Sequence, residues 1–160
     1  MYTASLSALK KELKSKSDQE LLAICLRLGR YKKENKELIH YLLLEAHDDA
    51  AYVEQIKADI AEGFETINDS NLYYAKKGIR KVLRVANKHI KYSGNKTSEV
   101  EVLLYFVQQI RDMDIPIQNS KVLVNLYLNQ IKKIEKALST LHEDLQYDYN
   151  LDLEDLKQIE

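Results

Sequence analysis

The sequence predicts an all-α protein of about seven helices, packed as an irregular antiparallel bundle or as a short, α-solenoid-like stack of helical hairpins. Three observations predict this class. The 160 residues include only four Gly and one Pro, the residues that interrupt helices most strongly. Apolar residues recur at three- and four-residue steps along most of the chain. The joints between these segments are short, which favours antiparallel neighbours.

The first two expected helices span 5–15 and 17–28. Ser17 and Glu20 have the spacing of a capping box, so the second helix is expected to begin directly after Ser17. Cys25 lies in an apolar run and is expected to be a buried thiol. As a lone cysteine it forms no disulfide framework, which indicates a reducing compartment.

The third and fourth expected helices span 35–47 and 48–68. The third is apolar over most of its circumference, so neighbours are expected to cover it. The fourth is acidic. Apart from Lys57, its charged residues are Asp48, Asp49, Glu54, Asp59, Glu62 and Glu65.

The fifth expected helix, 70–92, has a polar face of one sign. It carries seven Lys/Arg and no Asp or Glu. At about 100° per residue, the seven cations fall within roughly 140° of arc, opposite an apolar side. The residues on this arc that we expect to bind an anion or a partner are Tyr73, Lys77, Arg80, Arg84, Lys88 and Lys91.

The last two long helices are expected at 98–113 and 120–141. Ser98 and Glu101 have the spacing of a second capping box. The first of these helices is apolar on two faces, which makes it the best candidate for the centre of the core.

The domain organisation predicted from these elements is a single all-α domain, 1–142, followed by an acidic tail, 143–160. The tail is expected to carry a short helix at 151–158 or to be partly disordered, because its charges are almost all of one sign.

Three hypotheses explain the basic helix. In the first, the acidic helix at 48–68 lies beside it and neutralises it, although exposed ion pairs add only about 0–1 kcal/mol each. In the second, the cations follow a phosphate backbone and Tyr73 stacks on a base. In the third, the acidic tail folds over it. The net charge of −1 argues against a generally basic nucleic-acid binder.

Evidence for an enzyme is sparse. Glu37, His40 and His47 lie on one side of the third expected helix and are weak candidates for metal ligands. A di-metal helical bundle needs a second Glu-x-x-His pair and two more glutamates, and only one such pair is present. With four glycines and no phosphate-binding loop, no cofactor is expected. The longest apolar run, 102–107, is too short to span a bilayer, so a soluble cytoplasmic protein is expected.

Four segments together resemble an uncharacterised family of small all-helical bacterial proteins. They are LKKELKSKSDQELL at 9–22, YKKENKELIHYLLLEAHD at 31–48, SNLYYAKKGIRKVLR at 70–84 and KIEKALSTLHEDLQYDY at 133–149. The resemblance implies a bacterial origin and brings no activity with it.

The function expected from the sequence is that of a non-enzymatic interaction or scaffold protein that meets a protein partner through the basic helix. A nucleic-acid-associated helical protein that binds phosphates through the same face is the alternative. No membrane partner is expected, and the sequence leaves the oligomeric state open.

Overall fold

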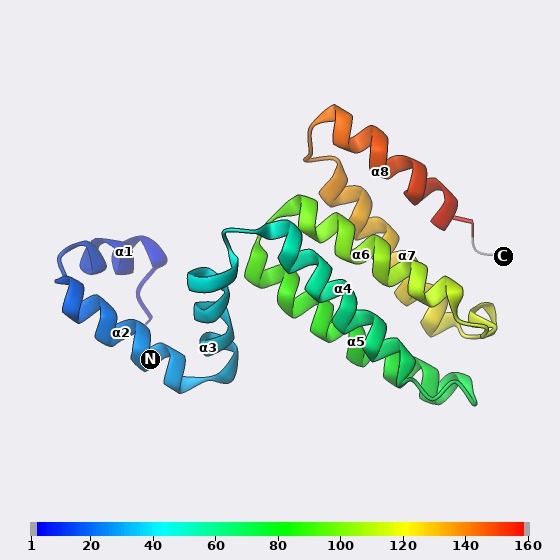
Figure 1. Ribbon diagram of the computed structural model, residues 1–160, viewed down its shortest axis with the longest axis horizontal. Coiled ribbons are helices and arrows are strands. Elements are labelled where there is room, and N and C mark those ends of the chain that lie inside the picture. The colour runs from blue at the N-terminus through cyan, green and yellow to red at the C-terminus, as the bar shows by residue number, and fades with distance from the viewer. Residues whose placement is uncertain (1–2, 159–160) are drawn as a thin grey trace. The chain divides into compact units, whose positions relative to one another are not determined.

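The computed structural model describes residues 3–158 (Figure 1). Within them the chain forms eight α-helices, one π-helical turn and one 3₁₀ turn, and no strand. The predicted all-α class is therefore confirmed, with one helix more than the seven expected. The elements are α1 (Leu6–Lys14), α2 (Asp18–Tyr31), α3 (Lys33–His40), η1 (Tyr41–Glu45), α4 (Asp49–Glu65), α5 (Leu72–Ser93), α6 (Lys96–Asp112), η2 (Ile117–Asn119), α7 (Lys121–Leu138) and α8 (Glu143–Leu156).

The chain divides into two compact units, Met1–Glu45 and Ala46–Glu160. This organisation differs from the predicted single domain 1–142 with a separate tail. In the first unit α2 packs on α3, and in the second α4 to α8 pack on one another. The predicted tail is part of the second unit because α8 contacts both α6 and α7.

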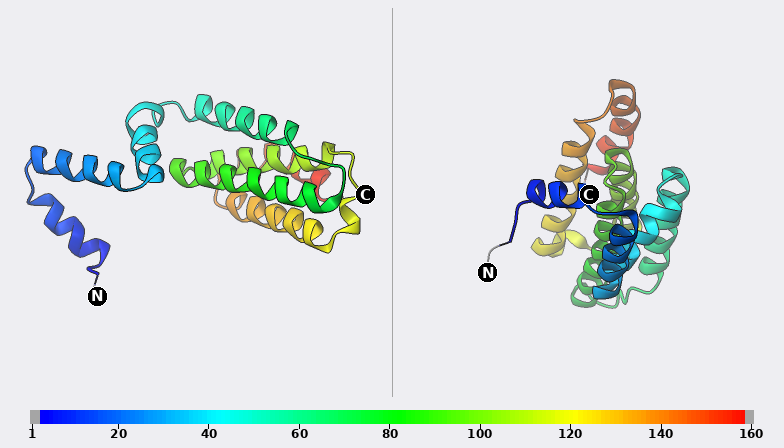
Figure 2. Two further views of the ribbon diagram at one scale, coloured as in Figure 1. Left: turned by 90° about the horizontal axis from the view of Figure 1, so that it is seen from below. Right: turned by 90° about the vertical axis from the view of Figure 1, so that its left-hand side faces the viewer.

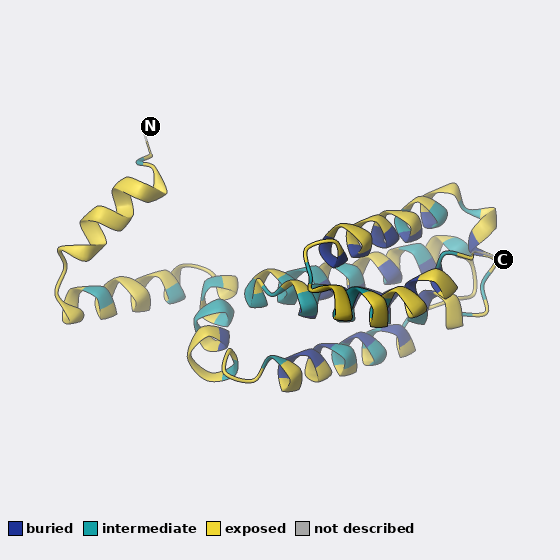
Figure 3. Ribbon diagram, turned by 90° about the horizontal axis from the view of Figure 1, so that it is seen from above, coloured by how far each residue is buried: buried dark blue, intermediate teal, exposed yellow. Residues whose placement is uncertain are grey.

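Helices α1, α2 and α3 of the first unit have no buried core, and Tyr41 of η1 is the residue of this unit that the structure describes as buried. No residue of α1, α2 or α3 is buried, and Leu6 is 84% exposed. Exposed residues accordingly cover most of these helices in Figure 3. Cys25 on α2 is exposed, so the expectation of a buried thiol is wrong. The apolar residues 42–44 are exposed as well, although neighbours were expected to cover them.

The start of α2 agrees with the sequence. Glu20 Oε2 accepts the Ser17 backbone N–H at 2.8 Å, and Ser17 Oγ accepts the Glu20 N–H at 3.3 Å. Both halves of the predicted capping box are therefore present. The helix then continues past Gly29 and ends at Tyr31.

Helix α6 is the centre of the second unit, as predicted, and Figure 2 shows this unit from two further sides. It contacts α4, α5, α7 and α8. Its buried residues are Ser98, Val100, Val102, Leu103, Leu104, Phe106, Val107 and Ile110. The predicted capping box at Ser98 is wrong. The side chain of Asn95 caps the helix instead, with its Oδ1 accepting the Thr97 N–H at 2.8 Å.

Helix α8 corrects the expectation of a short helix at 151–158 or of partial disorder. It begins directly after His142, whose side chain caps it. Leu153 and Leu156 are buried, and the Tyr127 hydroxyl donates to the Leu156 carbonyl at 2.7 Å. Arg111 Nη2 lies 2.7 Å from an Asp155 carboxylate oxygen. Two buried leucines, a hydrogen bond and an ion pair therefore attach this acidic segment to its neighbours.

Across the described part of the chain, none of the helices combines the length and the apolar character that crossing a membrane requires.

Candidate docking face on helix α5

Both ends of α5 are capped. The Asn71 side chain accepts the N–H groups of Tyr73 and Tyr74 at 3.0 and 3.1 Å, which satisfies two of the free donors of the first turn. Gly94 ends the helix in the left-handed conformation, with φ of 61°. The predicted bounds of 70–92 therefore agree with the structure to within about two residues.

One side of α5 is held tightly against the rest of the second unit. Its buried residues are Ala75, Ile79, Val82 and Ala86, and the helix contacts α4 and α6. The contact with α4 is so close that a Cβ added to Gly63 would lie 2.8 Å from Val82 Cγ2. The opposite side of α5 is directed away from this contact.

We call the outward side, formed by Tyr73, Lys77, Arg80, Arg84, Lys88 and Lys91, the basic face. All six residues were predicted from the sequence, and the helix presents them along one stripe. Except for Lys88, which is half-buried and has a partner, all are exposed. From Lys77 to Lys91 the stripe is roughly 21 Å long at the helical rise per residue.

Four of the five cations of the basic face are not paired with the acidic helix before them. Among the residues that the structure describes, Lys77, Arg80, Arg84 and Lys91 form no ion pair. The expectation that the acidic helix neutralises them is therefore not met at these four positions.

The carboxylates of α4 bind elsewhere. Glu54 accepts Lys57 at 2.8 Å, and Asp59 accepts the amide of Gln55 at 3.0 Å. Lys57 also reaches Glu101 of α6, at 3.4 Å. Glu54 and Asp59 of α4 therefore interact with side chains of α4 itself, and Lys57 connects α4 to α6 rather than to α5.

Tyr73 adds an aromatic ring to one end of the basic face. It is 64% exposed. Its ring meets that of Tyr74 edge-on, with 5.4 Å between centroids, and Lys76 Nζ lies 5.5 Å from the Tyr73 centroid. A cation near an exposed ring is a common feature of surfaces that bind proteins or nucleic acids.

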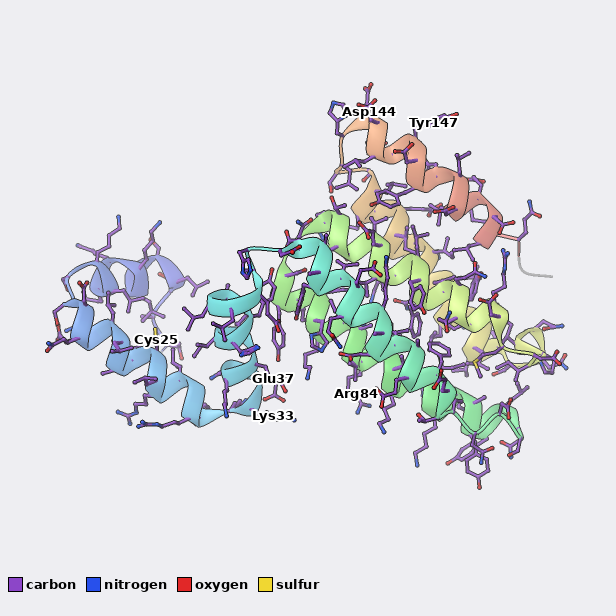
Figure 4. The ribbon with its side chains drawn as sticks, in the orientation of Figure 1. Cys25, Lys33, Glu37, Arg84, Asp144 and Tyr147 are labelled. Carbon is purple, nitrogen blue, oxygen red and sulfur yellow. The ribbon has the colours of Figure 1, made fainter. Side chains whose placement is uncertain are left out.

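The acidic tail does not fold over the basic face. In the view of Figure 4, Arg84 projects from one side of the second unit, whereas Asp144 and Tyr147 project from the other. Helix α8 lies against α6 and α7, and α5 lies against α4 and α6. The predicted intramolecular clasp is therefore absent from the described residues.

The weak metal candidates do not form a ligand set. Glu37 lies 3.7 Å from Lys33 Nζ, and His40 lies 3.2 Å from Glu45. Within 3–158, no three His, Cys, Asp or Glu side chains come together in a way that could hold a metal ion.

A groove between α4, α6 and α8, lined by both polar and apolar side chains, was not predicted from the sequence. Its volume is about 610 Å³. Tyr149 donates to Glu101 at 2.8 Å, and burial together with this hydrogen bond raises the pKa of Tyr149 to about 12. Burial lowers the pKa of Lys57, but Glu54 and Glu101 outweigh it, so the net pKa is raised. The helical spacing of Leu145, Tyr149, Leu153 and Leu156 could have indicated that α8 packs here.

Comparison with known proteins adds no family to this description. No family model matches the chain. No similar protein was found among the curated proteins, and no similar fold among the solved structures. The resemblance to a bacterial family stays a prediction.

Proposed function

We propose that this chain is a non-enzymatic interaction protein that binds an acidic protein surface through the basic face of α5. The observation that carries the proposal is the state of Lys77, Arg80, Arg84 and Lys91, which are exposed and form no ion pair within the described residues. Their helix is packed and capped, so the cations are presented on a rigid support. Little ordering of the backbone would be needed before a partner binds.

A carboxylate-bearing partner suits this surface better than a polyphosphate. Arginine binds carboxylates, as it binds phosphates, through two parallel hydrogen bonds, and Arg80 and Arg84 are one turn apart. Tyrosine and arginine are also enriched at protein interfaces. The chain has a net charge of −1, and α8 carries six acidic residues on the same unit. A long polyanion would be repelled by that helix, whereas a compact acidic surface can avoid it.

The test uses a fluorescently labelled poly-L-glutamate that is short enough to lie on α5 alone, and measures anisotropy at low and physiological salt. We expect binding that weakens with salt, and an affinity at least about tenfold lower for the double variant Arg80→Glu with Arg84→Glu. The matched control is Lys132→Glu with Lys133→Glu on α7, which makes the same change in net charge at exposed positions. Equal losses in both variants, or no binding at low salt, would refute the proposal.

Nucleic acid is the second candidate, and the exposure of Tyr73 beside cations favours it. If a base stacks on this ring, Tyr73→Ala should lower the affinity for single-stranded nucleic acid by about 1–3 kcal/mol. The same change should leave poly-L-glutamate binding nearly unaltered. The two candidates therefore separate in one pair of titrations.

The proposal also includes an irregular helical bundle for 46–160 and a cytoplasmic location. The contacts of α6 with four other helices support the bundle, because a solenoid repeat contacts only its neighbours. The location rests on the expectations drawn from the sequence.

A further inference from the structure

The second unit contains two helices of opposite charge. Helix α5 has seven Lys/Arg and no acidic residue. Helix α8 has six Asp/Glu and no Lys or Arg. Charge segregation of this degree gives one unit two complementary surfaces.

The two surfaces cannot meet within one copy of the packed unit. Helix α6 contacts both α5 and α8 on their inner sides. Arg84 and Asp144 therefore project in opposite directions (Figure 4). Any contact between the basic face and an α8 helix must involve the α8 of another molecule.

The outward side of α8 has both charge and apolar anchors. Tyr147 is 70% exposed and Leu151 is 63% exposed. Glu143, Asp148 and Asp152 form no ion pair within the described residues. We call this side the acidic face, and its residues are Glu143, Tyr147, Asp148, Leu151 and Asp152.

The remaining carboxylates of α8 already have partners. Asp144 lies 3.4 Å from the exposed ring of His142. Glu154 binds Lys157 at 2.7 Å, and Asp155 binds Arg111. The carboxylates available to another molecule are therefore concentrated in the first ten residues of α8.

The two faces are complementary in charge, and the acidic face is short enough to lie along the basic face. The acidic face spans roughly 14 Å, and the cations of the basic face from Lys77 to Lys91 span roughly 21 Å at the helical rise. Tyr147 can lie over an arginine of the basic face as a cation–π pair. Asp148 and Asp152 are one helical turn apart, as are Arg80 and Arg84.

We propose that the basic face of one copy binds the acidic face of a second copy. This inference rests on the proposed function and names its partner as α8 of the same protein. The contact is heterologous, since two different surfaces meet, so it generates a ring or an open chain of copies. Because it depends on exposed charges, the association is salt-sensitive and concentration-dependent.

The test is a charge exchange followed by sedimentation velocity at low salt. The first variant, Arg80→Glu with Arg84→Glu, makes α5 acidic at its centre. The second, Asp148→Lys with Asp152→Lys, makes α8 basic. We expect the wild-type protein to associate, each variant alone to be monomeric, and an equimolar mixture of the two variants to associate again.

The controls separate charge from folding. Glu62→Lys with Glu65→Lys alters exposed carboxylates of α4 and should leave association at the wild-type level. Circular dichroism and the melting temperature of each variant report whether it is folded. Recovery on mixing is also a folding test, since an unfolded variant could not restore it.

Other outcomes overturn the inference. A monomeric wild-type protein at every concentration would refute it, as would a mixture of folded variants that stays monomeric. If the wild-type protein is monomeric but still binds poly-L-glutamate through α5, the proposed function stands and the self-contact fails. If poly-L-glutamate binding is also absent, both fail.

Discussion

The hydroxyl of Tyr127 donates to the backbone carbonyl of Leu156 at 2.7 Å, and this bond joins α7 to the end of α8. Tyr127 is almost fully buried and Leu156 is buried beside it. A carbonyl in that position has no ready access to water, so the tyrosine hydroxyl satisfies a group that would otherwise be costly.

Tyr127→Phe removes that donor without changing the shape of the ring. We expect the free energy of unfolding to fall by about 1–3 kcal/mol, because the Leu156 carbonyl is left without its partner. Urea unfolding measures the change. Tyr147→Phe is the control, since Tyr147 is exposed, and it should change stability by less than about 0.5 kcal/mol. Similar effects from both variants would contradict the argument.

Gly78→Ala tests the close contact of α5 with Ile67, which follows α4. The new Cβ would lie 2.8 Å from Ile67 Cγ1 and 2.9 Å from its Cγ2. Alanine favours the helix by about 1 kcal/mol, but overpacking costs about 1–3 kcal/mol, so we expect a net loss of thermal stability. Gly29→Ala on α2 is the control. It meets only the terminal Cδ1 of Ile39, at 3.2 Å, and should be neutral or stabilising.

The raised pKa of Tyr149 predicts that the protein loses stability at alkaline pH. Its pKa is raised to about 12 from an ordinary value of 10.0, by burial and by the hydrogen bond to Glu101. The folded state thus favours the neutral phenol. The contribution of Tyr149 to the free energy of unfolding is complete below about pH 10 and is lost as the pH rises toward about 12. We expect the free energy of unfolding to fall across this window, and to fall less in Tyr149→Phe. If both proteins lose stability equally, Tyr149 is not responsible.

The contrast between the two units predicts unequal costs of removing a leucine side chain. Leu103 on α6 is almost fully buried, whereas Leu9 on α1 is exposed. We expect Leu103→Ala to cost about 2–5 kcal/mol because it leaves a cavity, and Leu9→Ala to cost less than about 0.5 kcal/mol. Chemical denaturation of both variants measures the difference. A large loss in Leu9→Ala would show that something covers α1 in solution.

Local signals in the sequence predicted much of the fold. The Ser17–Glu20 capping box and the expected bounds 70–92 agree with the structure, in which Asn71 and Gly94 cap α5, because each cap acts over a few residues. The box expected at Ser98 failed because Asn95 offers a cap three residues earlier and Ser98 lies inside the helix, buried. Where a sequence allows two possible start residues for a helix, tertiary packing selects one of them, and packing depends on residues far away in the sequence.

The remaining differences between the sequence-based expectations and the structure arise from tertiary contacts. Because 143–156 is rich in acidic residues, it was expected to be a tail, and the burial of Leu153 and Leu156 against neighbouring helices was not predicted. Cys25 was expected inside because its neighbours are apolar, but no residue of α2 is buried. The six residues of the basic face could be predicted from helical periodicity. Whether Arg80 and Arg84 were paired depended on where the carboxylates of α4 and α8 lie, which periodicity does not determine.

The opposed positions of α5 and α8 make the second unit an electric dipole, although the whole chain has a net charge of only −1. In the field of a charged surface such a body rotates before it touches, and the end that leads depends on the sign of the surface. Cation- and anion-exchange resins should therefore each retain the protein at neutral pH, holding it by opposite ends.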